Sequence, residues 1–317
     1  MTDVNIVFMG TPDFAVGVLK ALIDSDYNVV GVITAPDRPS GRGRKLSESA
    51  VKKYALEQEL TVLQPTNLKS ESFLNELKQL NANLQIVVAF RMLPKVVWQM
   101  PKLGTFNLHA SLLPDYRGAA PINWAIINGE DKTGVTTFFI DEKIDTGAII
   151  LQEETAINEN DTAGDLHDKL MHLGSKLVVK TVALIGEGEA KTKQQELSKN
   201  SIFKEAPKIY KETCRIDWTR SIEAVYNTIR GLSPYPGSWS VLHNNGETIE
   251  VKIYSAKKII EKHNDTIGKI ISNKKELKVV VDKGYIFIEN LQLPGKRKMN
   301  ITELLNGYLF HNNAYFE

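Results

Sequence analysis

Short apolar runs alternate with helical periodicity over the first 190 residues of the chain. Buried strands are predicted at 5–9, 29–33, 84–90, 104–108, 134–140 and 148–151. Between them, apolar residues recur at helical spacing over 11–23, 50–60, 72–80 and 163–186. Strands that alternate with amphipathic helices form parallel βαβ units. The pattern therefore predicts an α/β fold, with a Rossmann-like, doubly wound and mostly parallel sheet.

The pattern changes after residue 188. Residues 189–207 are rich in Lys, Gln, Glu and Ser, which predicts a linker across the surface. Beyond it, one helix is predicted at 221–229, followed by short strands at 249–254, 267–271, 277–281 and 285–288. Many short strands favour a small β-barrel. We therefore expect a first domain at 1–188, a linker at 189–207 and a smaller β-rich domain at 208–317.

Composition narrows the class of protein. The 317 residues are 42% hydrophobic and 24% charged, which is typical of a globular protein with a proper core. The net charge of +1 means that any nucleic-acid site must be a local basic patch. Cys214 is the single cysteine, which excludes a disulfide framework and a cysteine-based zinc site and fits a reducing cytosol. We expect a cytoplasmic protein with no membrane partner and no metal.

The end of the strand at 104–108 carries candidate catalytic residues. Asn107, His109 and Ser111 occupy alternate positions, so an extended chain places them on one face. Asp145 lies in a glycine-containing turn between two predicted strands, where it can approach His109. A carboxylate beside an imidazole orients the ring and stabilises its protonated form, and an amide donates to a developing oxyanion. A lone histidine is more often structural, and Asp is common in turns, so both interpretations stay open here.

Two basic segments are candidate nucleic-acid contacts. Residues 34–46 carry Arg38, Arg42, Arg44 and Lys45 against a single acidic residue, and their prolines and glycines predict no regular element. Such a loop either holds phosphates or is a solvated surface loop. A second basic turn at 294–299 contains Lys296, Arg297 and Lys298.

Taken together, these motifs resemble the methionyl-tRNA formyltransferases over nearly the whole chain. The resemblance rests on segments 8–14, 36–43, 107–114, 116–121, 141–147, 218–239 and 294–299. The stretch at 107–114, with the downstream Asp145-Thr146-Gly147, is similar to folate-dependent formyltransferases in general. The basic loop and the C-terminal segments narrow the resemblance to the tRNA enzymes.

The resemblance implies transfer of a formyl group from 10-formyltetrahydrofolate to the α-amino group of initiator methionyl-tRNA, without a metal. It gives Asn107, His109 and Asp145 the catalytic role, and the C-terminal domain an OB-like barrel that binds tRNA. The folate-binding residues that it implies are Phe90, Leu93, Ser111, Leu112, Leu113 and Pro114. The tRNA-binding residues that it implies are Arg38, Arg42, Arg44, Lys45, Lys296, Arg297 and Lys298.

Two other functions remain open at this point. A formyltransferase that acts on a small-molecule amine shares the three catalytic residues but has no need of the basic loop or the barrel. A non-enzymatic RNA-binding protein keeps the basic loop but has no use for Asn107, His109 and Asp145 together. A monomer is expected by default.

Overall fold

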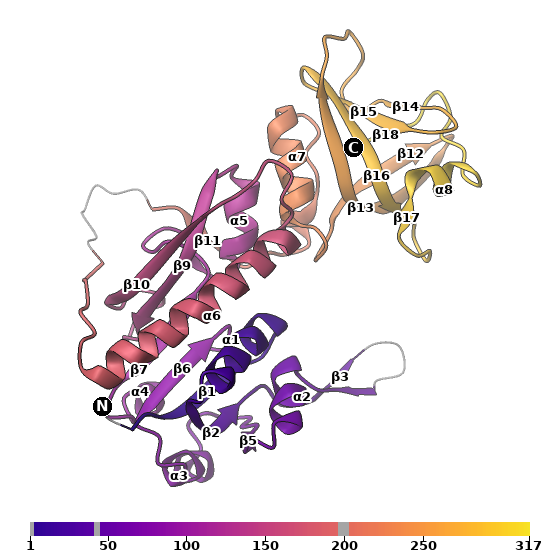
Figure 1. Cartoon of the computed structure of the whole chain (residues 1–317). Helices are drawn as coiled ribbons and strands as arrows, with labels where there is room; N and C mark the ends of the chain where they lie inside the picture. Colours follow the sequence, from indigo (N-terminus) through magenta and orange to yellow (C-terminus); the bar gives the residue numbers. More distant parts are fainter. Residues whose placement is uncertain (1–2, 41–44, 196–202) are drawn as a thin grey trace. The chain divides into compact units, whose positions relative to one another are not determined.

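The computed structural model describes residues 3–40, 45–195 and 203–317, which form two compact units (Figure 1). The first unit is drawn from Met1–Gly118, Thr133–Thr155 and His167–Glu205, and the second from Ala119–Lys132, Ala156–Leu166 and Ala206–Glu317. Each unit is thus assembled from three separate stretches of chain. The contiguous domain boundaries given above, at residues 188 and 208, stay a prediction.

The first unit is built on a seven-stranded sheet. In spatial order its strands are β10 (Ile149–Ala156), β9 (Lys132–Phe139), β7 (Thr105–His109), β6 (Leu84–Val88), β1 (Asn5–Gly10), β2 (Asn28–Ile33) and β5 (Val62–Leu63). The strands from β7 to β5 are parallel to their neighbours, and β9 is antiparallel to β7. The predicted Rossmann-like, mostly parallel sheet is confirmed.

Helices cover both faces of this sheet (Figure 1). On one face lie α1 (Asp13–Asp24) and α6 (Ala163–Glu187), where Gly174 of α6 leaves room for the Leu108 side chain of β7. On the other face, α3 (Glu71–Gln79) and α4 (Lys95–Trp98) pack on Val7, Met9 and Val87 in one apolar cluster. The helix α2 (Ala50–Glu57) begins after Ser49, whose side-chain hydroxyl caps the helix by accepting from the Lys52 amide. Burial on both faces explains the continuous apolar strands.

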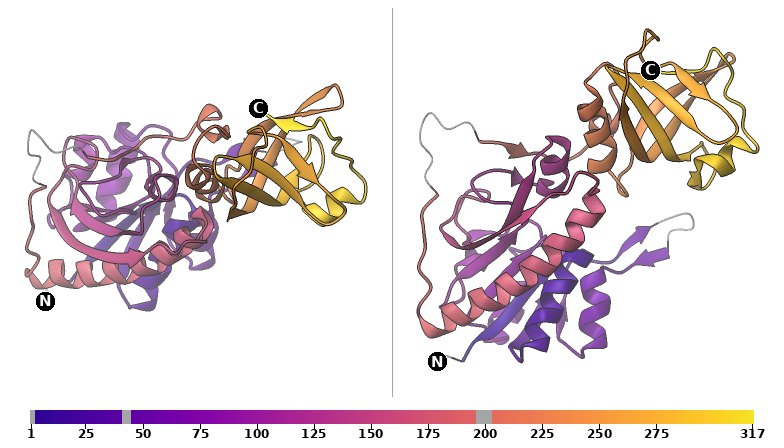
Figure 2. Two further views of the ribbon diagram at one scale, coloured as in Figure 1. Left: turned by 90° about the horizontal axis from the view of Figure 1, so that it is seen from above. Right: turned by 45° about the horizontal axis from the view of Figure 1, so that its top comes forward.

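The C-terminal part of the second unit is a nearly closed antiparallel barrel (Figure 2). Its main strands are β12 (Ser238–Asn244), β13 (Glu247–Ile260), β14 (Ile270–Ser272), β15 (Leu277–Val281), β16 (Gly284–Gln292) and β18 (Tyr315–Phe316). The two ends of this sheet meet where Phe316 N donates to Gly268 O at 2.8 Å. A Cβ at Gly268 would lie 2.4 Å from the Phe316 oxygen, so the closure requires glycine.

Smaller elements complete the two units. They are β8 (Arg117–Gly118), α5 (Pro121–Ile127), β11 (Glu205–Ala206), the 3₁₀ turn η1 (Glu212–Cys214), α7 (Ile222–Gly231), β17 (Met299–Asn300) and α8 (Ile301–Leu305). Among the described residues, no helix combines the length and the apolar character needed to cross a lipid bilayer.

The expectation of no regular element at 34–46 was wrong. Two short strands, β3 (Arg38–Ser40) and β4 (Lys45–Ser47), pair antiparallel there. The proline is accommodated because a two-stranded ribbon leaves one side of each strand unpaired, so Pro39 needs no amide hydrogen. Arg38 lies in the first strand, whereas Arg42, Arg44 and the side chain of Lys45 lie outside the described residues.

Candidate active site

The strand β7 brings two polar side chains to its carboxyl end. Asn107 pairs with Val87 of β6, and His109 pairs with Thr136 of β9. His109 is 6% exposed, while Asn107 is half-buried. Within the described part of the chain, no hydrogen bond reaches the Asn107 side-chain amide. Its two N–H donors are therefore available to a ligand.

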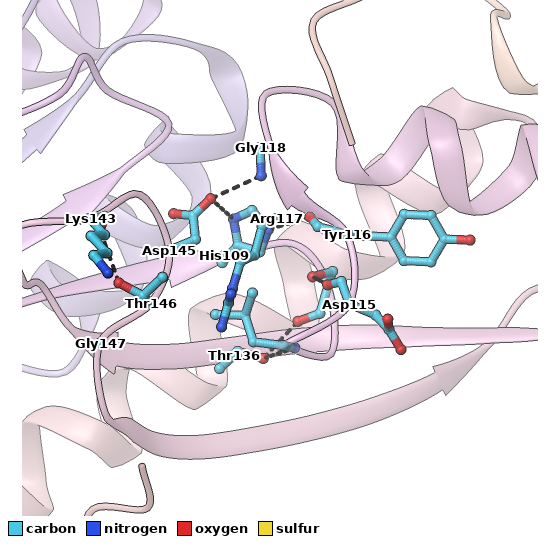
Figure 3. A network of polar contacts seen from close by, with 12 residues as sticks. His109, Asp115, Tyr116, Arg117, Gly118, Thr136, Lys143, Asp145, Thr146 and Gly147 are labelled. Carbon is cyan, nitrogen blue, oxygen red and sulfur yellow. Dashed lines mark hydrogen bonds and ion pairs between the residues drawn. The ribbon is translucent and has the colours of Figure 1, made fainter. Parts of the chain in front are cut away.

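The orientation of the His109 ring is set by two groups (Figure 3). Its Nε2 lies 2.8 Å from the Tyr116 carbonyl oxygen, and its Nδ1 lies 3.9 Å from Asp145 Oδ2. Because a carbonyl only accepts, Nε2 must carry a hydrogen and donate it. The other nitrogen, Nδ1, consequently carries no hydrogen in the neutral ring, and it faces a carboxylate.

Asp145 lies in a local turn, and its carboxylate accepts one hydrogen bond from a distant backbone amide. Its carboxylate accepts from the Gly118 amide at 3.0 Å, and its side chain is 13% exposed (Figure 3). Its backbone φ is +54°, a left-handed conformation that aspartate tolerates better than most residues. A Cβ at Gly147 would lie 1.7 Å from Phe139 O, so the turn presses its backbone against β9. The Asp-Thr-Gly sequence thus fits both the left-handed position and the close approach.

The segment after β7 is tied down from β9 and β10. The Thr136 hydroxyl accepts from the Leu113 amide at 3.1 Å and donates to the Ser111 carbonyl at 2.7 Å. The Gln152 amide donates to both Leu113 O and Thr136 Oγ1. These bonds fix the start of the loop that ends at Tyr116, and thereby the carbonyl that orients His109.

The expectation that Ser111 shares a strand face with Asn107 and His109 was wrong, because β7 ends at His109. Ser111 is fully buried in the following turn, where its hydroxyl donates to Asp115 O at 2.7 Å. The turn is closed by this bond and by the Thr136 hydroxyl, and it returns the chain so that Tyr116 O accepts from the histidine. Leu113 is buried against Phe138, whereas Leu112 and Pro114 are partly exposed.

An apolar cluster lies on the same sheet face as Asn107. Val87, its partner in β6, belongs to a cluster that includes Leu93 and Val97, with Phe90 packed against it. Leu93 is 8% exposed and Phe90 is half-buried, with the Arg91 guanidinium carbon 5.4 Å from its ring centroid. The cluster supplies an apolar wall beside the carboxyl ends of β6 and β7, where α/β proteins bind ligands.

The basic hairpin has a firmly anchored base. Asp37 accepts from Lys52 at 2.5 Å and from Gln64 at 2.8 Å. These hydrogen bonds hold the pKa of the Asp37 carboxyl below its ordinary value, and Lys52 also pairs with Glu48.

The second basic turn lies between β16 and β17 and exposes Lys296. Its Arg297 pairs with Glu303, and Lys298 Nζ lies 4.9 Å from the Tyr254 ring centroid.

Sequence reasoning missed the groups that position the catalytic candidates. The Tyr116 carbonyl, the Gly118 amide, Thr136 and Gln195 all contact the candidate site or its loops. A backbone group gives no signal in residue identity. Thr136 resembles an ordinary strand residue, and Gln195 lies in a polar stretch that predicts only a linker.

Family models match both parts of the chain. The model "Formyl transferase" matches residues 4–182, and the model "Formyl transferase, C-terminal domain" matches residues 208–309. The methionyl-tRNA formyltransferase of Flavobacterium johnsoniae is 61% identical over 314 residues, which are 99% of each chain. That of Bacteroides fragilis is 54% identical over 309 residues, covering 96% of this chain and 95% of the relative.

Solved structures share the fold at low identity. A sugar 3N-formyl transferase, WlaRD, solved with dTDP and 5-N-formyl-THF, matches with a TM-score of 0.63 and 21% identity, covering 94% of this chain and 100% of that one. HypX from Aquifex aeolicus in complex with tetrahydrofolic acid matches with a TM-score of 0.66 and 17% identity, covering 96% of this chain and 47% of that one.

Proposed function

Because the chain belongs to the methionyl-tRNA formyltransferases, we propose that Asn107, His109 and Asp145 are its catalytic residues. The reaction is transfer of a formyl group to the α-amino group of methionine on initiator tRNA, which gives the formylmethionyl-tRNA used to begin translation. The arrangement that carries the residue assignment is His109 held between a carbonyl and a carboxylate, beside the amide of Asn107, which no described residue engages.

We propose 10-formyltetrahydrofolate as the formyl donor. The apolar wall of Phe90 and Leu93 offers a packing surface for one face of the donor's ring system, on the sheet face that carries Asn107. In this proposal, the segment Ser111–Pro114 lines the opposite side of the folate site. The folate ligands bound to WlaRD and to HypX agree with this class of donor.

The residues perform carbonyl chemistry in this proposal. The methionyl amine attacks the formyl carbon, and the electron pair of the C=O bond moves to oxygen. Asn107 donates Nδ2–H to that oxygen, and His109 donates from Nδ1, as negative charge develops there. The C=O bond then re-forms as the bond between the formyl carbon and the folate nitrogen breaks. His109 gives its Nδ1 proton to the departing nitrogen and then takes up the proton lost by the amine, while Asp145, which faces the same Nδ1, orients the ring and stabilises its protonated form.

Binding of the tRNA is assigned to the basic hairpin and to the barrel. We place Arg38, Arg42, Arg44 and Lys45 at the acceptor stem, with the hairpin base fixed by Asp37, and the turn of Lys296, Arg297 and Lys298 on the tRNA backbone. We also propose that the reaction takes place in the cytoplasm, where initiator tRNA is used in translation. A monomer stays the prediction for the oligomeric state.

Steady-state formylation tests the assignment of the acceptor. We expect charged initiator tRNA to be formylated with a kcat/KM at least about 10³-fold above that for free methionine or an amino sugar nucleotide, because most of the proposed acceptor contacts are to tRNA. A preference for a small amine would favour the alternative enzyme class. Tight tRNA binding without any formyl transfer would favour a plain RNA-binding protein.

A salt titration tests the barrel turn. Replacing Lys296, Arg297 and Lys298 with alanine is expected to reduce the slope of log K against log salt by about 2, because each phosphate contact contributes roughly 0.7 to 0.9. Filter binding of charged tRNA between low and physiological salt measures this slope.

A matched variant removes three exposed lysines elsewhere on the barrel, Lys274, Lys275 and Lys283. It should leave the slope unchanged. An equal decrease in both variants would mean that only total charge matters, and the assignment of the turn would be wrong.

A further inference from the structure

The side chain of Gln195 makes three hydrogen bonds in the candidate active site. Its Nε2 donates to Asp145 O at 3.0 Å and to Gly147 O at 2.8 Å, and its Oε1 accepts from the Arg117 guanidinium. Carbonyl oxygens only accept and a guanidinium only donates, so these partners fix which way the amide points. Every strong donor of the side chain is therefore committed to the loop that carries Asp145.

Backbone pairing places Gln195 there. Ile149 and Lys193 exchange two N–H···O bonds, each 2.8 Å long, as an isolated antiparallel bridge. Because the pairing is antiparallel, residue 195, two positions after Lys193, lies opposite residue 147, two positions before Ile149. Residues 193–195 of the predicted linker thus lie alongside the Asp-Thr-Gly turn.

We propose that Gln195 is a positioning residue for catalysis, which holds the Asp145 carboxylate toward His109. The proposal rests on the proposed role of Asp145. Asp145 has a left-handed backbone that only its surroundings maintain. Gln195 bridges the carbonyls on either side of the Asp145–Gly147 turn, so a change of φ at Asp145 would break these bonds.

The same stretch of chain also contacts the other partner of His109. Tyr116 N donates to Lys204 O at 2.6 Å, and Lys204 N donates to Asp115 Oδ1 at 3.0 Å. Tyr116 itself has a φ of +61°, and its carbonyl accepts from the histidine. Residues 195 and 204 therefore support the carboxylate side and the carbonyl side of His109, respectively. Gln195 makes its hydrogen bonds through its side chain, whereas the hydrogen bonds of Lys204 given above use its backbone, so substitution of Gln195 tests this support directly.

Gln195 and its neighbour Gln194 differ in their contacts. Gln194 is exposed, and no described residue hydrogen-bonds to its side chain. The two glutamines have the same residue type and are adjacent in the chain, which makes Gln194 a matched control. Methionine is the suitable replacement because it keeps the length of the side chain and removes all three hydrogen bonds.

The experiment compares single-turnover and steady-state kinetics of Gln195→Met and Gln194→Met. We expect Gln195→Met to lower kcat about 10- to 100-fold while changing the KM for charged tRNA less than about 2-fold, because only the geometry of the catalytic pair is altered. Gln194→Met should match the wild type. A kcat of Gln195→Met within about 2-fold of the wild type would overturn the proposal.

A double-mutant cycle with Asp145→Asn distinguishes positioning from general damage. If Gln195 acts through Asp145, adding Gln195→Met to Asp145→Asn should change the rate by less than about 2-fold. A further loss equal to that of the single variant would mean that Gln195 acts elsewhere. Should Gln195→Met fail to fold, Gln195→Glu gives the same test, because it keeps the pairing with Arg117 but loses both donors to the turn.

The two variants distinguish a failure of the catalytic role of Asp145 from a failure of the positioning role of Gln195. If Asp145→Asn itself retains full activity, the catalytic role of Asp145 fails. If Asp145→Asn loses activity but Gln195→Met does not, the positioning role alone fails.

Discussion

Replacing Asp145 with asparagine is expected to lower kcat about 10³-fold and to leave the KM for charged tRNA within about 2-fold. Asparagine keeps the size of the side chain and an oxygen that can accept from the Gly118 amide, so the turn should persist. What it removes is the negative charge 3.9 Å from His109 Nδ1. Without that charge the ring loses the partner that stabilises its protonated form in the transition state. Single-turnover formylation of charged initiator tRNA, followed with enzyme in excess, measures the chemical step.

The control for this variant is Asp26→Asn. Asp26 also has a left-handed backbone, with a φ of +58°, but it is exposed in the turn after α1. Its substitution reproduces the change of residue type and backbone context without touching the site, so wild-type kinetics are expected. If Asp145→Asn kept near-normal turnover, the carboxylate would have no role in proton transfer, and the catalytic assignment would have to rest on His109 and Asn107 alone.

The first domain could be predicted well because its elements are buried on both faces. Continuous apolar runs such as 5–9 and 84–90 have few alternatives to central parallel strands, and they became β1 and β6. The helix α6 was placed within one residue of its observed end, because its apolar positions repeat over many turns. Polar residues at the end of such a strand stand out for the same reason, and Asn107 and His109 were found in this way.

The barrel was harder to predict because its strands are short or bent. The strand β12 alternates between buried and half-buried residues but follows a segment rich in proline and glycine, and no strand was predicted there. The strand β13 continues to Ile260, and its register shifts near Ser255, so the alternation is interrupted midway. The hairpin of β3 and β4 was missed because proline and glycine dominate its sequence.

Contacts between distant residues could not be predicted from local patterns at all. Asp145 was linked to His109 only by its position at a strand end, and the real geometry depends on Gly118 and Tyr116 as well. Gln195 reaches the site through pairing of Lys193 with Ile149, a bridge of one residue pair that leaves no periodicity. Positioning groups of this kind can be recognised only from the tertiary structure, because the local sequence pattern would be the same with any other polar residue at that position.

Replacing Asn107 with alanine is expected to lower kcat about 10²- to 10³-fold, the cost of removing one oxyanion donor, or roughly 3 to 4 kcal/mol. Within the described chain the amide has no partner, so its loss should leave the free energy of unfolding unchanged within about 0.5 kcal/mol. Asn75→Ala, on the exposed side of α3, serves as the control for both measurements.

The aspartate variant at the same position sharpens this test. Asn107→Asp has nearly the shape of the wild type, but it sets a negative charge where the proposal places the developing oxyanion. We therefore expect Asn107→Asp to be slower than Asn107→Ala, although alanine removes more atoms. If Asn107 only filled space beside the apolar wall, the order would reverse, because aspartate preserves the packing and alanine does not. The ranking of the two rates under single-turnover conditions thus decides whether the amide acts on charge or on shape.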